Sequence, residues 1–215
     1  MKRQLRILST LIVLALATSS FASPFEGVIF FQKVDGKDVT YFRYYVKGDH
    51  IRIEDVNEGG VLNGILLINM QEKSLKMLSC SAQMYIDVPV AKESERPKVK
   101  IDRTGEVRMI LGKECELWKV VNMVDYSNYE FWVNVGEYNF FTPMLKMLNR
   151  NDNIALAWVS SMMGHNYFPF EGAEYSSTGK LLTKLEVIDI KDKELDLNLF
   201  DIPANYSLFE KNQDQ

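Results

Sequence analysis

The side chains with the greatest potential for chemistry are two histidines and two cysteines, scattered along the 215-residue chain. His50, Cys80, Cys115 and His165 do not stand at the spacing of a zinc site, whose ligands come in closely spaced pairs. A catalytic Cys–His dyad would need the two side chains to meet in space, and nothing in the sequence indicates that they do. We therefore expect no catalytic residue, no metal site and no cofactor.

Paired carboxylates offer a second route to chemistry, at Glu54-Asp55 and at Asp189 with Asp192. A general acid–base pair needs a cleft and a raised pKa, and neither is indicated near these positions, so we interpret these carboxylates as solvated. The sequence also lacks the motifs of serine hydrolases, P-loop nucleotide enzymes, dinucleotide-binding folds and zinc peptidases. We expect the protein not to be an enzyme.

The two cysteines leave two alternatives open. In an oxidising compartment, a disulfide between Cys80 and Cys115 would stabilise the fold by about 3 to 4 kcal/mol in the chain-entropy model. Alternatively, both thiols are buried and pack as small hydrophobic side chains. Both residues lie in strand-like segments whose adjacency the sequence does not show.

The strongest pattern is apolar and lies in residues 139–164, a predicted helical insert. Apolar side chains recur at helical spacing in residues 140–148, and a second short helix is expected at 154–163 after an N-cap at Asp152 or Asn153. These stripes either belong to a solid core or, with their flexible methionines, line a hydrophobic cavity against a curved sheet. The predicted lining is Trp132, Phe140, Phe141, Met144, Leu145, Leu148, Trp158, Met162 and Met163.

The elements that would position this cluster are strands joined by short turns. Residues 25–54 combine β-branched and aromatic side chains with turns at Asp35-Gly36 and Gly48-Asp49. No helix is indicated before residue 139, which is typical of an antiparallel sheet built from hairpins. Residues 129–135 alternate cleanly except for Trp132, which we expect the next segment to cover. Further strands are expected at residues 61–70, 75–79, 83–88, 106–111, 115–123, 168–176 and 181–190, with an exposed loop at 89–97.

Residues 1–22 have the pattern of a signal peptide. Basic residues precede an apolar core at 7–17, and the small side chains of Ser20 and Ala22 offer a cleavage site. The alternative is an uncleaved anchor, but the core is shorter than the about 20 apolar residues that span a bilayer. No cysteine follows the core, so a lipid-modified N-terminus is not expected. We predict a periplasmic protein whose mature chain starts at Ser23.

Composition indicates one ordinary globular domain over residues 23–215, with 47% hydrophobic and 25% charged residues. The formal net charge of -4 becomes -7 without the three basic residues of the leader. An acidic domain is a poor binder of nucleic acid or of anionic membrane surfaces. We expect that the protein has no nucleic-acid partner and that it is not an integral membrane protein.

Several short phrases resemble an exported bacterial family of unknown function assigned to the lipoprotein-carrier-like superfamily. They are Phe25-Glu26-Gly27, Val46-Lys47-Gly48-Asp49, Ile51-Arg52-Ile53-Glu54, Leu67-Ile68-Asn69, residues 112–115 and Leu199-Phe200-Asp201-Ile202-Pro203. The superfamily contains periplasmic lipoprotein carriers and their outer-membrane acceptors. The resemblance implies a mainly β (α+β) fold, a curled antiparallel sheet forming an unclosed half-barrel with a short helical lid. It also implies a cavity for acyl chains rather than a catalytic site.

Two functions from different classes follow. The first is a periplasmic binding or carrier protein for a hydrophobic or amphiphilic ligand, a lipid or acyl chain, held between sheet and helices. The alternative is an envelope protein that senses or scaffolds a partner protein, with a solid core and no ligand. A hollow beneath the helical insert favours the first function, and a filled interior favours the second.

Overall fold

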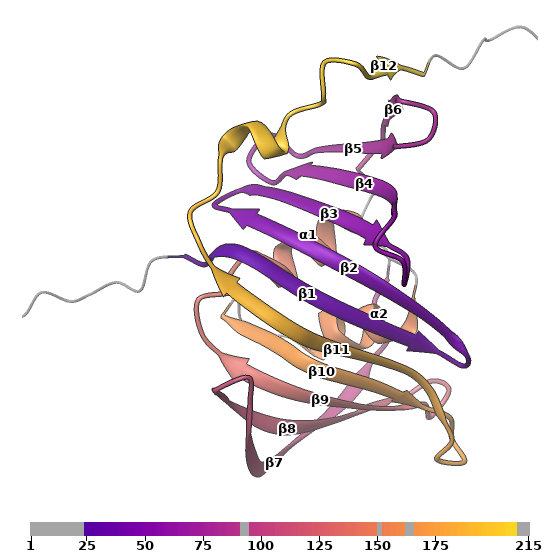
Figure 1. Ribbon diagram of the computed structural model, residues 1–215. Helices are drawn as coiled ribbons and strands as arrows, with labels where there is room; N and C mark the ends of the chain where they lie inside the picture. Colours follow the sequence, from indigo (N-terminus) through magenta and orange to yellow (C-terminus); the bar gives the residue numbers. More distant parts are fainter. Residues whose placement is uncertain (1–23, 91–94, 150–151, 162–165, 210–215) are drawn as a thin grey trace, which may run out of the picture.

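Twelve strands form one sheet in the computed structural model, which describes residues 24–90, 95–149, 152–161 and 166–209. The first six strands follow one another as a meander, and β7 to β11 form a second meander (Figure 1). The two meanders join where β11 pairs antiparallel with β1. The strands are β1 Glu26–Asp35, β2 Asp38–Lys47, β3 His50–Val56, β4 Leu62–Asn69, β5 Ser74–Ser79, β6 Met84–Asp87, β7 Val99–Ile110, β8 Lys113–Asn122, β9 Asn128–Val135, β10 Tyr167–Tyr175, β11 Leu181–Asp192 and β12 Ser207–Leu208.

The sheet curls but does not close. Its order is β12-β6-β5-β4-β3-β2-β1-β11-β10-β9-β8-β7, so β12 and β7 are its edges. The expected mainly β, unclosed half-barrel is therefore confirmed. β7 is longer than the predicted strand at 106–111: it starts at Val99 and is interrupted between Arg103 and Val107. The charged residues there hid the strand, because an exposed edge strand does not need an apolar face.

Two short helices, α1 (Phe141–Leu148) and α2 (Asn153–Ser161), lie against one face of the curled sheet (Figure 1). The Asp152 carboxylate caps α2 by accepting a hydrogen bond from the Ala155 amide at 3.1 Å, as the sequence predicted. α1 ends where Asn149 adopts the left-handed conformation, with φ of 43°. Neither helix is long and apolar enough to span a membrane, nor is any other helix in the described residues.

The core between helices and sheet is dominated by aromatic rings. Phe168 of β10 is fully buried, and its ring lies 4.9 Å from that of Phe141 on α1 and 5.9 Å from that of Phe31 on β1. Tyr138 stacks on the same ring at 4.4 Å. Each large ring removes roughly 150–250 Å² of apolar surface from water. This cluster therefore fixes the helices to the sheet.

The outer face of β3 to β6 is covered by the C-terminal segment, residues 195–209. Lys47 and Arg52 donate hydrogen bonds to the backbone oxygens of Leu195 and Leu199, at 2.8 and 3.1 Å. Downstream apolar side chains of this segment pack on a small outer cluster, and β12 pairs with β6. The predicted irregular tail with apolar anchors is thus an outer strap that also protects a sheet edge. The anchors are Ile202 and Tyr206, and the outer cluster is Ile65, Leu67 and Leu78.

Gly27, in the Phe25-Glu26-Gly27 phrase, is required by a close backbone approach. A Cβ at this position would lie 2.2 Å from the Lys191 carbonyl oxygen of β11, and the φ of 157° is unfavourable for other residues. We expect Gly27→Ala to lower the free energy of unfolding by about 2 to 3 kcal/mol, because the backbone pairing of β1 with β11 must shift. Urea denaturation measures this.

The control is Gly64→Ala on β4, where the nearest atom to an added Cβ is 3.6 Å away. That variant should stay within about 1 kcal/mol of the wild type. Equal stabilities of the two variants would contradict a special role for Gly27.

Candidate functional site

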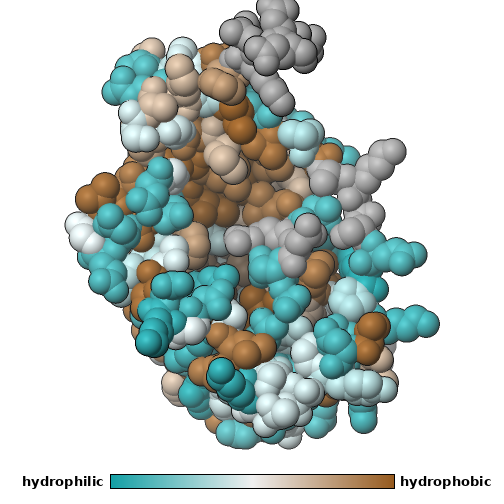
Figure 2. Space-filling model, turned by 90° about the vertical axis from the view of Figure 1, so that its right-hand side faces the viewer, coloured by the Kyte–Doolittle hydropathy of each residue, from teal (hydrophilic) through white to brown (hydrophobic). Residues whose placement is uncertain are grey.

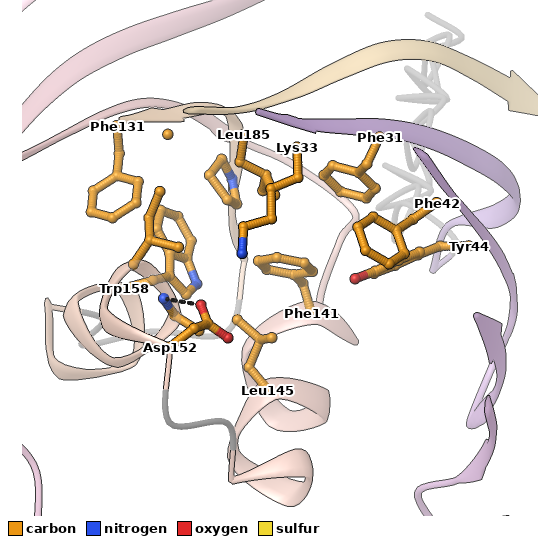
Figure 3. Close-up of a pocket in the computed structure, with 14 residues that line it drawn as sticks. Phe31, Lys33, Phe42, Tyr44, Phe131, Phe141, Leu145, Asp152, Trp158 and Leu185 are labelled. Carbon is orange, nitrogen blue, oxygen red and sulfur yellow. Dashed lines mark hydrogen bonds between the residues drawn. The ribbon is translucent and has the colours of Figure 1, made fainter. Parts of the chain in front are cut away.

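An apolar pocket lies between the two helices and the concave face of the sheet (Figure 3). The free space within it is about 60 Å³. Small-molecule sites typically measure about 300–1,000 Å³ and are lined mainly by hydrophobic side chains, so this pocket alone would hold only part of a ligand. Its apolar lining comes from both layers: Phe31, Phe42, Tyr44, Phe131, Pro169 and Leu185 from the sheet, and Phe141, Leu145, Ile154, Ala155 and Trp158 from the helices.

A second apolar hollow continues from the first over β2 to β5. Its free space is about 390 Å³. Phe42 lines both hollows, and α1 contributes Leu145 to the pocket and Leu148 to the groove. Figure 2 shows a hydrophobic hollow of this kind on one side of the molecule. The remaining apolar lining of the groove is Ile53, Ile65, Leu66, Leu75, Met77, Val88 and Pro89.

Strand alternation directs the sheet residues into the pocket. Phe31 on β1 and Leu185 on β11 point inward, while their chain neighbours point to the other face. Gly172 on β10 lines the pocket without a side chain: an added Cβ would lie 3.1 Å from Ile154 Cδ1 and 3.2 Å from the Phe131 ring. Gly172 therefore lets Ile154 and the Phe131 ring pack close to β10, and the small Ala155 side chain adds little bulk to the lining.

Polar groups around the pocket are few. Lys33 and Asp152 are its charged lining residues, and Lys33 Nζ lies 3.7 Å from Asp35 Oδ2. Among the described residues, no group of three or more histidine, cysteine, aspartate or glutamate side chains is arranged to hold a metal ion. His50 lies on β3 with its ring 5.8 Å from that of Phe200. The pocket offers shape and apolar surface rather than a set of reactive groups.

The predicted lining residues fall into several groups. Phe141, Leu145 and Trp158 line the pocket, and Leu148 lines the groove. The structure places Phe140 and Met144 in the core: Met144 is fully buried, and Phe140 packs against Phe25 and Phe141. Met162, Met163 and His165 lie outside the described residues, as does the predicted leader.

The prediction for Trp132 was wrong. Consecutive side chains of a strand point to opposite faces, and on β9 Phe131 is the one that faces the pocket. The Trp132 ring instead lies beneath the Arg108 guanidinium, 4.1 Å from its carbon, and Arg108 is ion-paired with Glu171. A cation over its ring, rather than the helical segment, covers Trp132.

Sequence reasoning missed the pocket residues contributed by strands. Phe31, Phe42, Phe131 and Leu185 were recognised only as strand residues. The alternation within each strand gives two candidate faces, but the face that the helices cover depends on the pairing of β1 with β11. On the strand before the helical insert, Tyr129 and Phe131 are aromatic residues two positions apart, so they share one face of the strand. A search for this pattern could have found Phe131.

The disulfide alternative is not what the structure has, since both cysteines are free. Cys115 is buried on β8 in the main core, whereas Cys80 follows β5 and packs in the outer cluster. Seven strands separate β5 from β8 in the sheet order. Burial raises the pKa of the Cys115 thiol to about 11.

We expect one fast-reacting thiol per chain in the native protein. At pH 8 a thiol-specific reagent should modify Cys80, which is half-buried, while Cys115 stays protected because it is buried and protonated. Both should react in denaturant. Peptide mapping after brief labelling checks this, and rapid native labelling of Cys115 would contradict the placement of β8.

Comparisons with known proteins agree with this architecture. An uncharacterized conserved protein from Thermus thermophilus superposes with a TM-score of 0.53 at 13% identity, over 89% of this chain and 92% of that chain. This similarity shows a shared fold. The MucA/MucB complex of Pseudomonas aeruginosa matches with a TM-score of 0.48 at 11% identity, over 83% of this chain and 56% of that chain. A putative outer membrane lipoprotein-sorting protein domain from Vibrio parahaemolyticus matches with a TM-score of 0.34 at 7% identity, over 83% and 89%.

No curated protein matches the sequence. A family model described as "Domain of unknown function (DUF4412)" matches residues 25–206, which is nearly all of the described chain. The predicted membership of a family of unknown function is thereby confirmed, and the unclosed sheet with its helical cover is the architecture that the resemblance implied. The chain belongs to the DUF4412 family.

Proposed function

We propose that the protein is an exported, periplasmic binding or carrier protein for a hydrophobic or amphiphilic ligand, a lipid or an acyl chain. The observation that carries the proposal is the apolar hollow that helices and sheet line from opposite sides. The basic and apolar leader in residues 1–22 supports export. The scarcity of reactive groups around the hollow fits binding better than catalysis, and we expect no enzymatic activity.

The groove has about 390 Å³ of free space and the adjoining pocket about 60 Å³, so an acyl chain would lie mainly in the groove with one part in the pocket. Burying one methylene contributes about 0.8 kcal/mol, so a chain of about fifteen methylenes would contribute about 12 kcal/mol, from which the costs of association subtract about 4 kcal/mol or more. Those costs leave affinities in roughly the micromolar range. Such an affinity suits a carrier, which must also release its ligand.

Native mass spectrometry of the protein, exported and purified without detergent, tests the proposal. We expect a bound species with the mass of a lipid, and saturable uptake of a fluorescent fatty-acid probe by the delipidated protein at one or two sites. A ligand-free protein that takes up no probe would overturn the proposal.

The exposed edge of the sheet supports a second function, the binding of a partner protein. Among the described residues no strand pairs with the outer edge of β7, and Val107 and Met109 on that strand are 51% and 64% exposed. An unpaired edge can add a strand from another chain. A crosslinked pull-down from the envelope that recovers a specific protein, with no lipid bound, would favour this function. Recovery of neither would remove it.

A further inference from the structure

The mouth of the apolar pocket is a polar recess between the ends of β1, β10 and β11 and the start of α2. Its free space is about 360 Å³. Three of its residues, Lys33, Asp152 and Ile154, also line the apolar pocket. A ligand with its tail in the pocket would therefore place its head in this recess.

Glu174 is a carboxylate in the recess with few partners. The residue is 7% exposed, and its Oε1 accepts a hydrogen bond from the neutral Asn153 amide at 2.9 Å. Its other oxygen, Oε2, accepts no hydrogen bond from any described residue, and no described cation forms an ion pair with it. Buried carboxylates normally have a cationic or fully hydrogen-bonded environment. Glu174 therefore offers one oxygen to a cation entering the recess.

Lys33 supplies the opposite charge at the same place. Its side chain extends from β1 toward Asp152 at the start of α2 (Figure 3) and is 24% exposed. Its ion pair with Asp35 is long, at 3.7 Å, which leaves the ammonium able to donate to another acceptor. The Asp152 carboxylate already accepts a hydrogen bond from the Ala155 amide as the cap of α2.

Resting on the proposed function, we propose that the site prefers amphiphiles with a zwitterionic head that combines a phosphate with a primary ammonium. The ammonium would donate to Glu174, and the phosphate would accept from Lys33. A purely anionic head would meet one lysine among Asp35, Asp152 and Glu174. An uncharged head would leave the Glu174 carboxylate without a cation.

Competition for a fluorescent acyl probe tests the preference. The delipidated full chain is titrated with lysophosphatidylethanolamine, lysophosphatidylglycerol and a monoacylglycerol of equal chain length, all below their critical micelle concentrations. We expect the zwitterionic lipid to bind at least about tenfold more tightly than the other two, because it alone forms both charge-assisted hydrogen bonds.

Glu174→Gln isolates the ammonium contact, since glutamine keeps the size of the side chain and the acceptor for Asn153. The variant should lose the preference for the ammonium head while binding monoacylglycerol as the wild type does. Glu186→Gln, on the opposite face of β11, is the matched control and should leave the preference intact. Thermal denaturation establishes that both variants fold.

The outcomes separate the two proposals. Equal affinity of the wild type for all three heads, or an unchanged preference in Glu174→Gln, would overturn the zwitterionic head and leave the acyl site standing. If the delipidated protein binds neither the probe nor any of the three amphiphiles, both proposals are overturned.

Discussion

Replacing Ala155 with phenylalanine is expected to weaken uptake of an acyl probe, raising its dissociation constant by at least about tenfold because a ring would occupy the space of several methylenes. Ala155 lies on α2, and its side chain lines the pocket next to Trp158 and Asp152. It is only partly buried, so a larger side chain can extend into the hollow without displacing a packed neighbour. The measurement is a fluorescence titration of the delipidated variant.

Leu156→Phe is the matched control. It introduces the same ring at the next position of α2, which does not line the pocket. We expect this variant to bind the probe as the wild type does. If Ala155→Phe folds and still binds normally, or if both variants lose binding equally, the ligand does not occupy the pocket beneath α2.

Replacing Phe168 with alanine is expected to destabilise the protein by about 4 kcal/mol, within the range for buried large-to-small aromatic substitutions. The residue is fully buried, and its ring contacts rings from β1, β10 and α1 and from the segment between β9 and α1. The substitution removes apolar contact and leaves a cavity at the junction of helices and sheet. Equilibrium urea denaturation, with the slope compared between variants, measures the change.

Phe209→Ala is the control, because that phenylalanine is 53% exposed. Its loss should change the free energy of unfolding by less than about 0.5 kcal/mol. A loss of about 1 kcal/mol or less on replacing Phe168 would show that helices and sheet are not held together by this cluster.

The strands and the helical insert could be predicted because local patterns determine them. Alternation defined β9, and the spacing of Phe141 and Leu145 defined α1. Asp152 was predictable as a cap because a short polar side chain before an apolar run satisfies free helix amides. The outline of the pocket on its helical side followed from these local features.

The sheet side of the pocket could not be predicted, because it depends on contacts distant in sequence. β1 pairs with β11, which lies far away in the sequence. That pairing decides whether Phe31 and Leu185 lie on the face of the sheet that the helices cover. Trp132 shows the same limit: its hydrophobic character suggested the pocket, and strand parity placed it on the other face. The separation of Cys80 from Cys115 likewise follows from strand order rather than from spacing.

The most direct test of the central claim is to map where an acyl chain contacts the protein. The delipidated protein is irradiated with a fatty acid carrying a diazirine near the end of its chain, and the labelled residues are identified by peptide mass spectrometry. We predict labels on inward-facing residues of both layers, such as Leu145, Ile154 and Leu185. Labels confined to Leu67 and Leu78 of the outer cluster, or no saturable labelling, would contradict an acyl site between the helices and the sheet.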